Sequence, residues 1–288
     1  MGSGSWNTST FANYVTSTSL SRGYTATVDS LGTISTMASN QDMFKAVKVD
    51  EALNPYKIMR ECKDSEEHPN TLPIILALDV TGSLGQAAVE IAKKLNVIMT
   101  SLYDKVKDVE FMIMGIGDLY CDIGPIQISQ FESDVRIAEQ LDKLWFEFGG
   151  GGNFWESYTV AWYMGSRHCK LDCWNRGKKG IIITIGDERL NPILQHEKLS
   201  ALTGDTLQAD IVTKDLYNEV TEKYNVYHIH VDHDNRVWDK ENIDKSWEIL
   251  GNNYKKANMN NVADVIVDII VNNDDKETTS TSNDGISW

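Results

Sequence analysis

Apolar residues in the middle of the chain alternate between short unbroken runs and longer segments with helical spacing. Unbroken apolar runs of this length are typical of strands buried on both faces. Apolar residues recurring three and four positions apart indicate amphipathic helices. The strands are expected at 72–79, 109–116, 126–128, 180–185 and 225–231, and the helices at 83–103, 131–144, 155–165, 213–223, 240–250 and 262–271. This alternation predicts an α/β domain with a doubly wound, mostly parallel, Rossmann-like sheet flanked by helices.

The two ends of the chain have a different composition. Residues 1–40 are rich in Ser, Thr, Gly and Asn and lack a sustained apolar period, so we expect an extended, flexible N-terminal arm. Residues 41–71 mix short apolar clusters with charges, as in a linker that packs along a domain. The domain itself is expected at 72–272, and the polar, low-complexity residues 273–288 are expected to form a tail.

Composition and charge narrow the class of protein. A chain of 288 residues with 41% hydrophobic residues is long enough to bury a large core. Its apolar runs are strand-sized and it opens with no export signal, so we expect a soluble, cytoplasmic protein, with a virion as the alternative. The formal charge of −15 repels phosphate backbones, which disfavours nucleic acid as a partner and favours cations or basic protein surfaces. Acidity alone would equally suit plain solubility.

Three oxygen-bearing residues follow the first predicted strand at alternate positions. Asp79 ends that strand, and Thr81 and Ser83 stand in the tight turn after it. In doubly wound sheets ligands bind beyond the carboxyl ends of the strands, and carboxylates and hydroxyls are ligands that Mg²⁺ and Mn²⁺ prefer. Ser83 can also cap the next helix, but capping explains neither an Asp at the end of a buried strand nor the Thr81 hydroxyl.

The sequence Asp79-Val80-Thr81-Gly82-Ser83 resembles the first metal-binding motif of von Willebrand factor A-type (vWA) domains that carry a metal-ion-dependent adhesion site (MIDAS). It matches the Asp-x-Thr-Gly-Ser form of many intracellular bacterial and phage members. The resemblance extends to two later loops. Four glycines at 149–152 precede Asn153 where the family's second loop is expected, and Asp187 follows strand 180–185 where its third loop supplies an Asp.

The resemblance implies a cation, Mg²⁺ or else Mn²⁺ or Ca²⁺, with an open coordination position that an Asp or Glu of a protein partner completes. The implied ligands are Asp79, Thr81, Ser83, Asn153 and Asp187. The sequence departs from the family in two places. The usual second-loop Thr is absent, so Asn153 is the candidate there with Glu156 in reserve, and the third loop, 184–187, is longer than the family's Thr-Asp-Gly.

We therefore expect a metal-dependent protein-interaction module and not an enzyme. One alternative is an assembly component of a phage particle or large bacterial complex, in which the N-terminal arm threads onto its neighbours. Another is a metal-dependent hydrolase with Asp187 or Glu188 as base and His228 and His230 as accessory ligands. A nucleotide phosphate loop is disfavoured, because no Gly-Lys-Ser/Thr follows the four glycines.

Three smaller groups of polar residues can each be interpreted in two ways. Asp118 and Asp122 either tune the site through water or simply end a strand. Cys169 and Cys173 are either buried reduced thiols, which the sparse cysteine content favours, or half of a zinc site.

The third group lies on the predicted strand 225–231 and just after it. Period-two alternation places His228, His230 and Asp232 on one face, where they could bind Zn²⁺. The favoured interpretation is that both histidines are hydrogen-bonded residues at the edge of the core and that Asp232 lies in the following loop.

Overall fold

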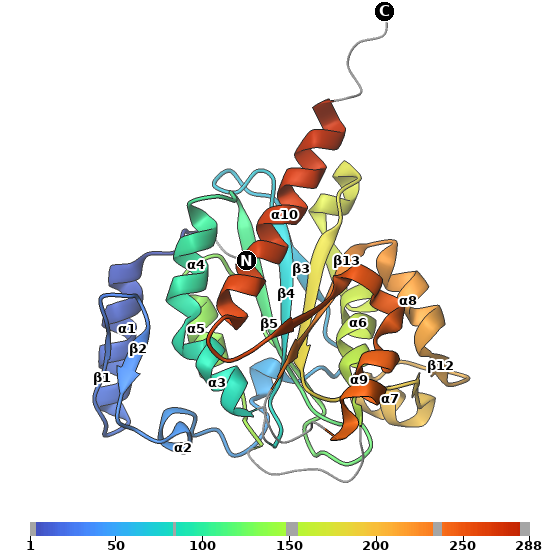
Figure 1. Cartoon of the computed structure of the whole chain (residues 1–288), viewed down its shortest axis with the longest axis horizontal. Coiled ribbons are helices and arrows are strands. Elements are labelled where there is room, and N and C mark those ends of the chain that lie inside the picture. Colours follow the sequence, from blue (N-terminus) through green and yellow to red (C-terminus); the bar gives the residue numbers. More distant parts are fainter. Residues whose placement is uncertain (1–3, 83–84, 148–154, 233–237, 283–288) are drawn as a thin grey trace, which may run out of the picture.

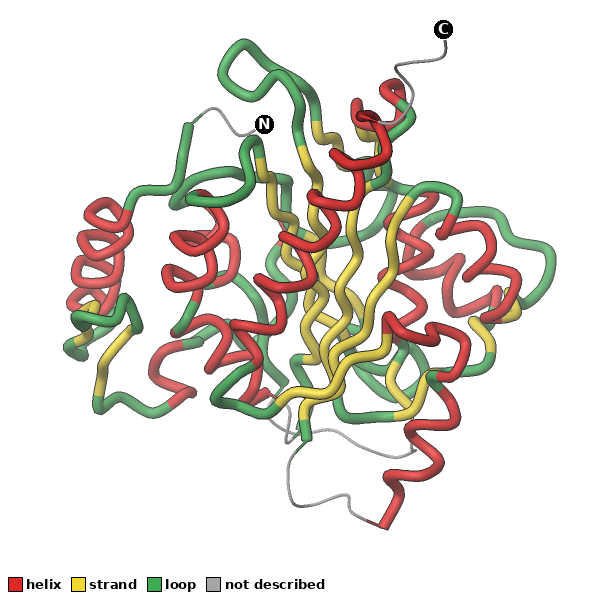
Figure 2. The backbone as a smooth tube through the Cα atoms, turned by 45° about the horizontal axis from the view of Figure 1, so that its top comes forward, coloured by secondary structure: helices red, strands yellow, loops and turns green. Residues whose placement is uncertain are grey.

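A central sheet of six strands organises the chain. The computed structural model describes residues 4–82, 85–147, 155–232 and 238–282. Along the sheet the strands are β14 (Tyr254–Ala257), β13 (Tyr224–Val231), β9 (Gly180–Gly186), β4 (Leu72–Asp79), β5 (Val109–Ile116) and β6 (Ile126–Ile128). Neighbouring strands are parallel except β6, which runs antiparallel to β5 at one edge (Figures 1 and 2). The predicted mostly parallel sheet is confirmed.

The unbroken apolar runs are explained by two hydrophobic cores, one on each face of the sheet. In β4 the side chains of Ile74, Leu76 and Leu78 enter one core, and those of Ile75 and Ala77 enter the other. Successive side chains of a strand point to opposite faces, so a strand between two cores needs apolar residues at every position. Seven of the eight β4 residues and all eight β5 residues are buried.

Helices cover both faces, as predicted (Figure 2). One core is closed by α3 (Gly85–Lys93), α4 (Leu95–Tyr103), α5 (Arg136–Leu141) and α10 (Val262–Ser282). The other is closed by α6 (Tyr158–Arg167), α7 (His196–Thr203), α8 (Thr213–Thr221) and α9 (Lys240–Ser246). None of the helices in the described part of the chain is long and apolar enough to cross a membrane.

Shorter elements complete the chain. They are α1 (Thr8–Ser21), β1 (Ala26–Val28), β2 (Ile34–Thr36), α2 (Asn40–Met43), η1 (Glu51–Leu53), β3 (Arg60–Cys62), β7 (Trp155–Glu156), β8 (Cys169–Leu171), η2 (Asp172–Arg176), β10 (Arg189–Leu190), β11 (Ile193–Leu194), β12 (Ile211–Val212) and η4 (Glu248–Asn253). Within residues 41–71, β3 pairs with β8, which lies more than a hundred residues later.

Several helix boundaries differ from the predicted ones. The expected helix 83–103 is divided at Lys94 into α3 and α4, and the expected helix 131–144 is reduced to α5. The expected helix at 155–165 begins only at Tyr158, because Trp155 and Glu156 pair instead with β10. That pairing partner is remote in sequence, so helical periodicity could not reveal it.

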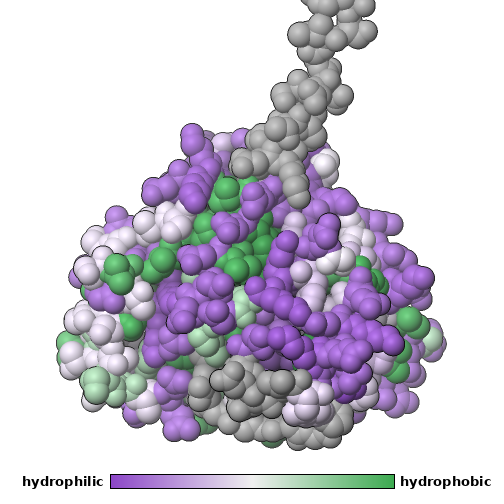
Figure 3. All heavy atoms as spheres, viewed as in Figure 1, coloured by the Kyte–Doolittle hydropathy of each residue, from purple (hydrophilic) through white to green (hydrophobic). Residues whose placement is uncertain are grey.

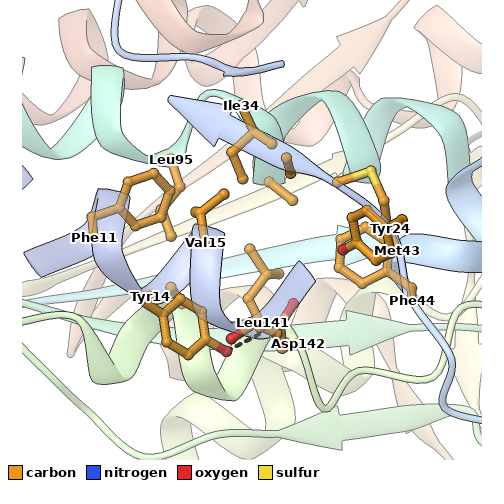
Figure 4. Close-up of a pocket in the computed structure, with 14 residues that line it drawn as sticks. Phe11, Tyr14, Val15, Tyr24, Ile34, Met43, Phe44, Leu95, Leu141 and Asp142 are labelled. Atoms are coloured by element: carbon orange, nitrogen blue, oxygen red, sulfur yellow. Dashed lines mark hydrogen bonds between the residues drawn. The ribbon is translucent and has the colours of Figure 1, made fainter. Parts of the chain in front are cut away.

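The N-terminal residues differ from the expected extended arm. Helix α1 begins after Asn7, whose side chain accepts a hydrogen bond from the Thr10 backbone N–H at 3.0 Å, and β1 pairs antiparallel with β2. Phe11 and Val15 of α1 are buried. Their side chains point with those of Ile34, Met43 and Phe44 into a space closed by Leu95 and Leu141 (Figure 4). The i, i+4 spacing of Phe11 and Val15 was the sequence signal for this helix.

Polar contacts reinforce this packing. The Tyr14 hydroxyl donates a hydrogen bond to Asp142, the residue that follows α5 (Figure 4). Arg22, at the end of α1, forms an ion pair with the same carboxylate at 3.3 Å and donates to the Met43 carbonyl at 2.6 Å. Helix α1 therefore contacts the rest of the domain through both apolar and charged groups.

The C-terminal helix is longer than expected. We predicted a helix ending at residue 271 and a tail from 273, whereas α10 continues to Ser282. Asn273 is buried, and its amide nitrogen donates to the Ile269 carbonyl at 2.7 Å and to the Tyr227 hydroxyl at 2.9 Å. Apolar atoms gather beside this helix on an otherwise largely hydrophilic face (Figure 3).

Phe11→Ala should lower the free energy of unfolding by about 3–5 kcal/mol, because it removes a buried aromatic side chain and leaves a cavity. Equilibrium urea unfolding measures this change. Met37→Ala is the control, since the Met37 side chain is fully exposed in the same segment and its removal should change stability little. Equal stability of the two variants would show that α1 does not pack on the domain in solution.

Candidate functional site

The candidate site lies where the order of the strands reverses. Numbered along the chain, the six strands of the sheet stand in the order three-two-one-four-five-six, so β4 and β9 are neighbours although their crossover connections run in opposite directions. Ligands of doubly wound sheets bind at such a switch point, beyond the carboxyl ends of the two strands. Asp79 ends β4, and Asp187 directly follows β9. The topology thus brings together two residues that the sequence analysis selected from separate loops.

Asp79 organises the turn that follows β4. Its side chain is almost fully buried. Its Oδ1 atom accepts hydrogen bonds from the Thr81 backbone N–H at 2.9 Å and from the Thr81 hydroxyl at 2.8 Å. Gly82 has a positive φ of 45°, which glycine adopts readily, and its N–H donates to the Glu147 carbonyl at 3.3 Å. The turn is therefore held both by its own carboxylate and by the loop before residue 148.

Glu156 is the second carboxylate of the site. The Thr81 hydroxyl lies 3.1 Å from Glu156 Oε1, so it stands between the Asp79 and Glu156 carboxylates. A hydroxyl has one proton, so it can donate to only one of them at a time. The other Glu156 oxygen, Oε2, is buried and has no hydrogen-bond partner within the described residues. The residue held in reserve for the second loop thus lies at the site.

Tyr158 connects the first and third loops. Its hydroxyl donates to Asp79 Oδ2 at 3.1 Å and accepts from the Glu188 backbone N–H at 3.3 Å. A Cβ atom on Gly186 would overlap the Tyr158 ring and hydroxyl, so glycine is required there for the ring to reach Asp79. The sequence shows no sign of this contact, because the periodicity of residues 155–165 does not separate a buried helical tyrosine from one that reaches Asp79.

Burial raises the pKa of two carboxyl groups of the site, and neighbouring acids raise it further. Burial, and secondarily the nearby charge of Asp187, raises the pKa of Asp79 to about 8. Burial also raises the pKa of Glu156 well above its usual range, and Asp79, Asp122 and Asp118 raise it further. Several acids in a low-dielectric environment repel each other unless protons or a cation neutralise them. The electrostatics therefore favour binding of a positive ion.

Asp118 and Asp122 build the loop after β5. Asp122 Oδ2 accepts from the Asp118 backbone N–H at 2.6 Å, and Asp118 Oδ1 accepts from the Tyr120 N–H at 3.1 Å and the Ser157 hydroxyl at 3.2 Å. These bonds fasten the loop to the start of α6, next to Glu156. These bonds fit the interpretation that Asp118 and Asp122 end the strand and shape the turn after it. An effect of the two carboxylates on the site through water remains a prediction.

Three of the five expected metal ligands lie in the described part of the chain. Of the five ligands expected from the resemblance, Asp79, Thr81 and Asp187 are described and buried, whereas Ser83 and Asn153 lie outside the described residues. Within those described, no group of three or more His, Cys, Asp or Glu residues has an arrangement that could hold a metal ion. The donor set of carboxylates and a hydroxyl nevertheless fits a hard cation, and the unpartnered Glu156 oxygen is available to it.

The histidines of β13 belong to an aromatic cluster. The His228 ring stacks on Trp247, with 3.6 Å between ring centroids and 10° between planes, and its Nδ1 lies 2.9 Å from the Thr184 hydroxyl. Burial holds the pKa of His228 well below its usual value, so the ring is neutral. Asp232 forms an ion pair with Lys240 at 2.9 Å. The interpretation as a hydrogen-bonded core residue therefore describes His228, and Asp232 lies in the following loop. His230 is also buried, but its Nδ1 has no hydrogen-bond partner among the described residues.

The cysteines, all of which lie within the described residues, are not joined in disulfides. Cys169 and Cys173 are buried and form no disulfide. Burial raises the pKa of Cys169 to about 12, which disfavours the thiolate that zinc binds. The interpretation as buried reduced thiols fits this environment.

No protein-family model and no curated protein matches the sequence. Among solved structures, the chain is similar to the pilus adhesin SpaC from Lactobacillus rhamnosus GG in its open conformation, with 14% identity, 76% of this chain covered and a TM-score of 0.45. It is also similar to proximal thread matrix protein 1 from the mussel byssus, with 11% identity, 73% of this chain covered and a TM-score of 0.45. The alignments span 31% and 49% of those chains, respectively.

In metal-free solution the free energy of unfolding should fall as pH rises from about 4 to about 8. The raised pKa of Asp79 means that folded protein holds a proton that the unfolded chain releases near pH 4, so this stabilisation is complete below that pH and is lost as pH passes the folded pKa. Asp79→Asn should flatten this dependence, because the amide does not ionise. Urea unfolding in EDTA across the pH range measures it, and identical slopes for wild type and variant would contradict the assignment.

Proposed function

We propose that this chain is a divalent-metal-dependent protein-interaction module with a vWA-like fold, whose MIDAS-like site binds Mg²⁺ and, through it, a carboxylate of a partner. The observation that carries the proposal is the buried Thr81 hydroxyl between the Asp79 and Glu156 carboxylates. Both carboxylates lie at the switch point of the sheet and carry raised pKa values. A cation bound between the two carboxylates would be coordinated by both of them and would remove the repulsion between their charges.

Each residue of the site has a defined part in this proposal. Asp79 and Thr81 supply oxygen ligands from the first loop, and Glu156, held by the short β7–β10 ladder, takes the second-loop position. Asp187 contributes from the third loop. Tyr158 orients Asp79 by its hydrogen bond to Oδ2. When bound, the ion would supply a positive centre with an exchangeable coordination position for a partner's Asp or Glu.

The hydrolase alternative is less well supported. It would use His228 and His230 as accessory ligands, yet His228 is stacked on Trp247 and its Nδ1 is engaged by Thr184. Turning His228 towards the carboxylates would break both contacts inside a packed core. A binding function needs no such rearrangement.

Millimolar Mg²⁺ or Mn²⁺ should raise the melting temperature, because a ligand that binds only the folded protein stabilises it, by about 2.7 kcal/mol at a hundred times its Kd. Asp79→Ala should abolish the rise, and Glu156→Gln should reduce it. Glu219→Ala is the control, since Glu219 pairs with Arg167 at the end of α6 opposite to Tyr158. Differential scanning fluorimetry measures all four proteins. An unchanged rise in Asp79→Ala would disprove the metal assignment.

Partner binding should depend on the ion. Without a cation, the acids at the site would repel an incoming carboxylate, so a partner captured in Mg²⁺ should be released by EDTA. Asp187→Ala should weaken capture while circular dichroism shows an intact fold. Affinity capture with quantitative mass spectrometry checks both. A partner that stays bound in EDTA and tolerates Asp79→Ala would instead favour the assembly role.

A further inference from the structure

A groove lies directly beside the candidate site, on the other side of the β7–β10 ladder. In that ladder Trp155 pairs with Arg189, and Glu156 pairs with Leu190. Neighbouring side chains of a strand point to opposite sides. Glu156 is therefore buried at the acid site, whereas the preceding Trp155 is 38% exposed and lines the groove.

The groove has a volume of about 520 Å³ and runs between β7, β10, the end of β12, α8 and α9. Elements β12, α8 and α9 lie together at the lower right in Figure 1, on one side of the sheet. A second pocket of about 320 Å³ adjoins it and shares Trp155, Asn191 and Pro192 with it. The two hollows thus share part of their walls.

The charge of the groove is opposite to that of the chain as a whole. Its described lining includes Arg189, Lys214 and Lys245 and no Asp or Glu, although the chain has 42 acidic and 27 basic residues. Arg189 is bound by Asp239, with 2.8 Å between Nε and Oδ2. Lys214 and Lys245 are exposed, and neither makes an ion pair or hydrogen bond to the described residues. Two ammonium groups are therefore available to a ligand.

The groove also offers apolar surface for a side chain. Val212 is 48% exposed and lines the groove together with Trp155. The adjoining pocket is lined by Tyr120, Pro192 and Ile193 together with Trp155, and it contains no charged side chain among its described residues. A cationic rim beside an aromatic and aliphatic pocket suits an acidic segment that also carries a large apolar residue.

We propose that this groove binds an acidic peptide segment of the partner, with an aromatic or aliphatic side chain in the pocket at Trp155 and carboxylates at Lys214 and Lys245. This inference rests on the proposed function and specifies the partner's chemistry. In this proposal the bound segment continues past the β7–β10 ladder, which the groove and the acid site share, and would place a further carboxylate at the proposed metal. A phosphate polymer would satisfy the lysines but not the apolar pocket, and the chain's charge of −15 opposes it.

The test uses a fluorescein-labelled synthetic peptide of alternating Glu and Leu with one Phe, titrated with the full chain and followed by fluorescence anisotropy. The charge-reversal variant is Lys214→Glu with Lys245→Glu. Its matched control is Lys105→Glu with Lys107→Glu, two exposed lysines between α4 and β5 at the opposite end of the sheet. Both double variants change the net charge equally, and circular dichroism confirms their folds.

We expect the peptide to bind about tenfold more weakly to the groove variant than to wild type and to the control variant. A peptide with Gln in place of Glu should bind weakly to all three. Equal affinity for the three proteins, no measurable binding to wild type, or tighter binding of a single-stranded oligonucleotide of the same charge would each overturn the proposal.

Peptide binding measured in EDTA and with the Asp79→Ala variant distinguishes a failure of the groove proposal from a failure of the proposed metal site. Peptide binding that is lost with the lysine reversals but persists in EDTA and in Asp79→Ala supports the groove and removes the metal from binding. Binding lost in EDTA but unchanged by the lysine reversals leaves the metal site in place and overturns the groove.

Discussion

The desolvation of acidic side chains at the carboxyl ends of β4 and β9 is the constraint on which the site depends. Asp79, Glu156 and Asp187 are all buried, in a region where like charges are costly unless they are neutralised. Two central strands bring Asp79 and Asp187 together, and the two hydrophobic cores fix those strands from both faces. The same packing that stabilises the sheet therefore holds these acids out of water.

Aromatic packing adjusts the geometry around these acids. Tyr158 reaches Asp79 only because Gly186 leaves room for its ring, and the ring also lies against His228 and Trp247. Trp247 in turn donates a hydrogen bond to the Glu188 carbonyl at 3.1 Å. The aromatic cluster thus links the third loop to α6 and gives the histidines of β13 a packing role.

The β7–β10 ladder separates two surfaces of opposite charge. On one side it holds Glu156 among the acids, and on the other it holds Trp155 and Arg189 in the groove. Trp155 and Glu156 are consecutive residues of β7, so alternation of side chains sends them to opposite surfaces. A cation bound in the acid site would neutralise the negative charge there, and an acidic segment bound in the groove would neutralise the positive charge of the groove.

The sequence by itself determined the sheet and the residues at its edge. Unbroken apolar runs predicted β4 and β5 with their observed ends, and the strand–helix alternation placed Asp79, Thr81 and Asp187 after parallel strands. Only the tertiary structure decided which loops meet. The β7–β10 pairing, the contact of Tyr158 with Asp79 and the packing of Phe11 on Leu95 all join residues far apart in the chain. Local periodicity carries no information on such contacts, because they depend on how the elements pack in space.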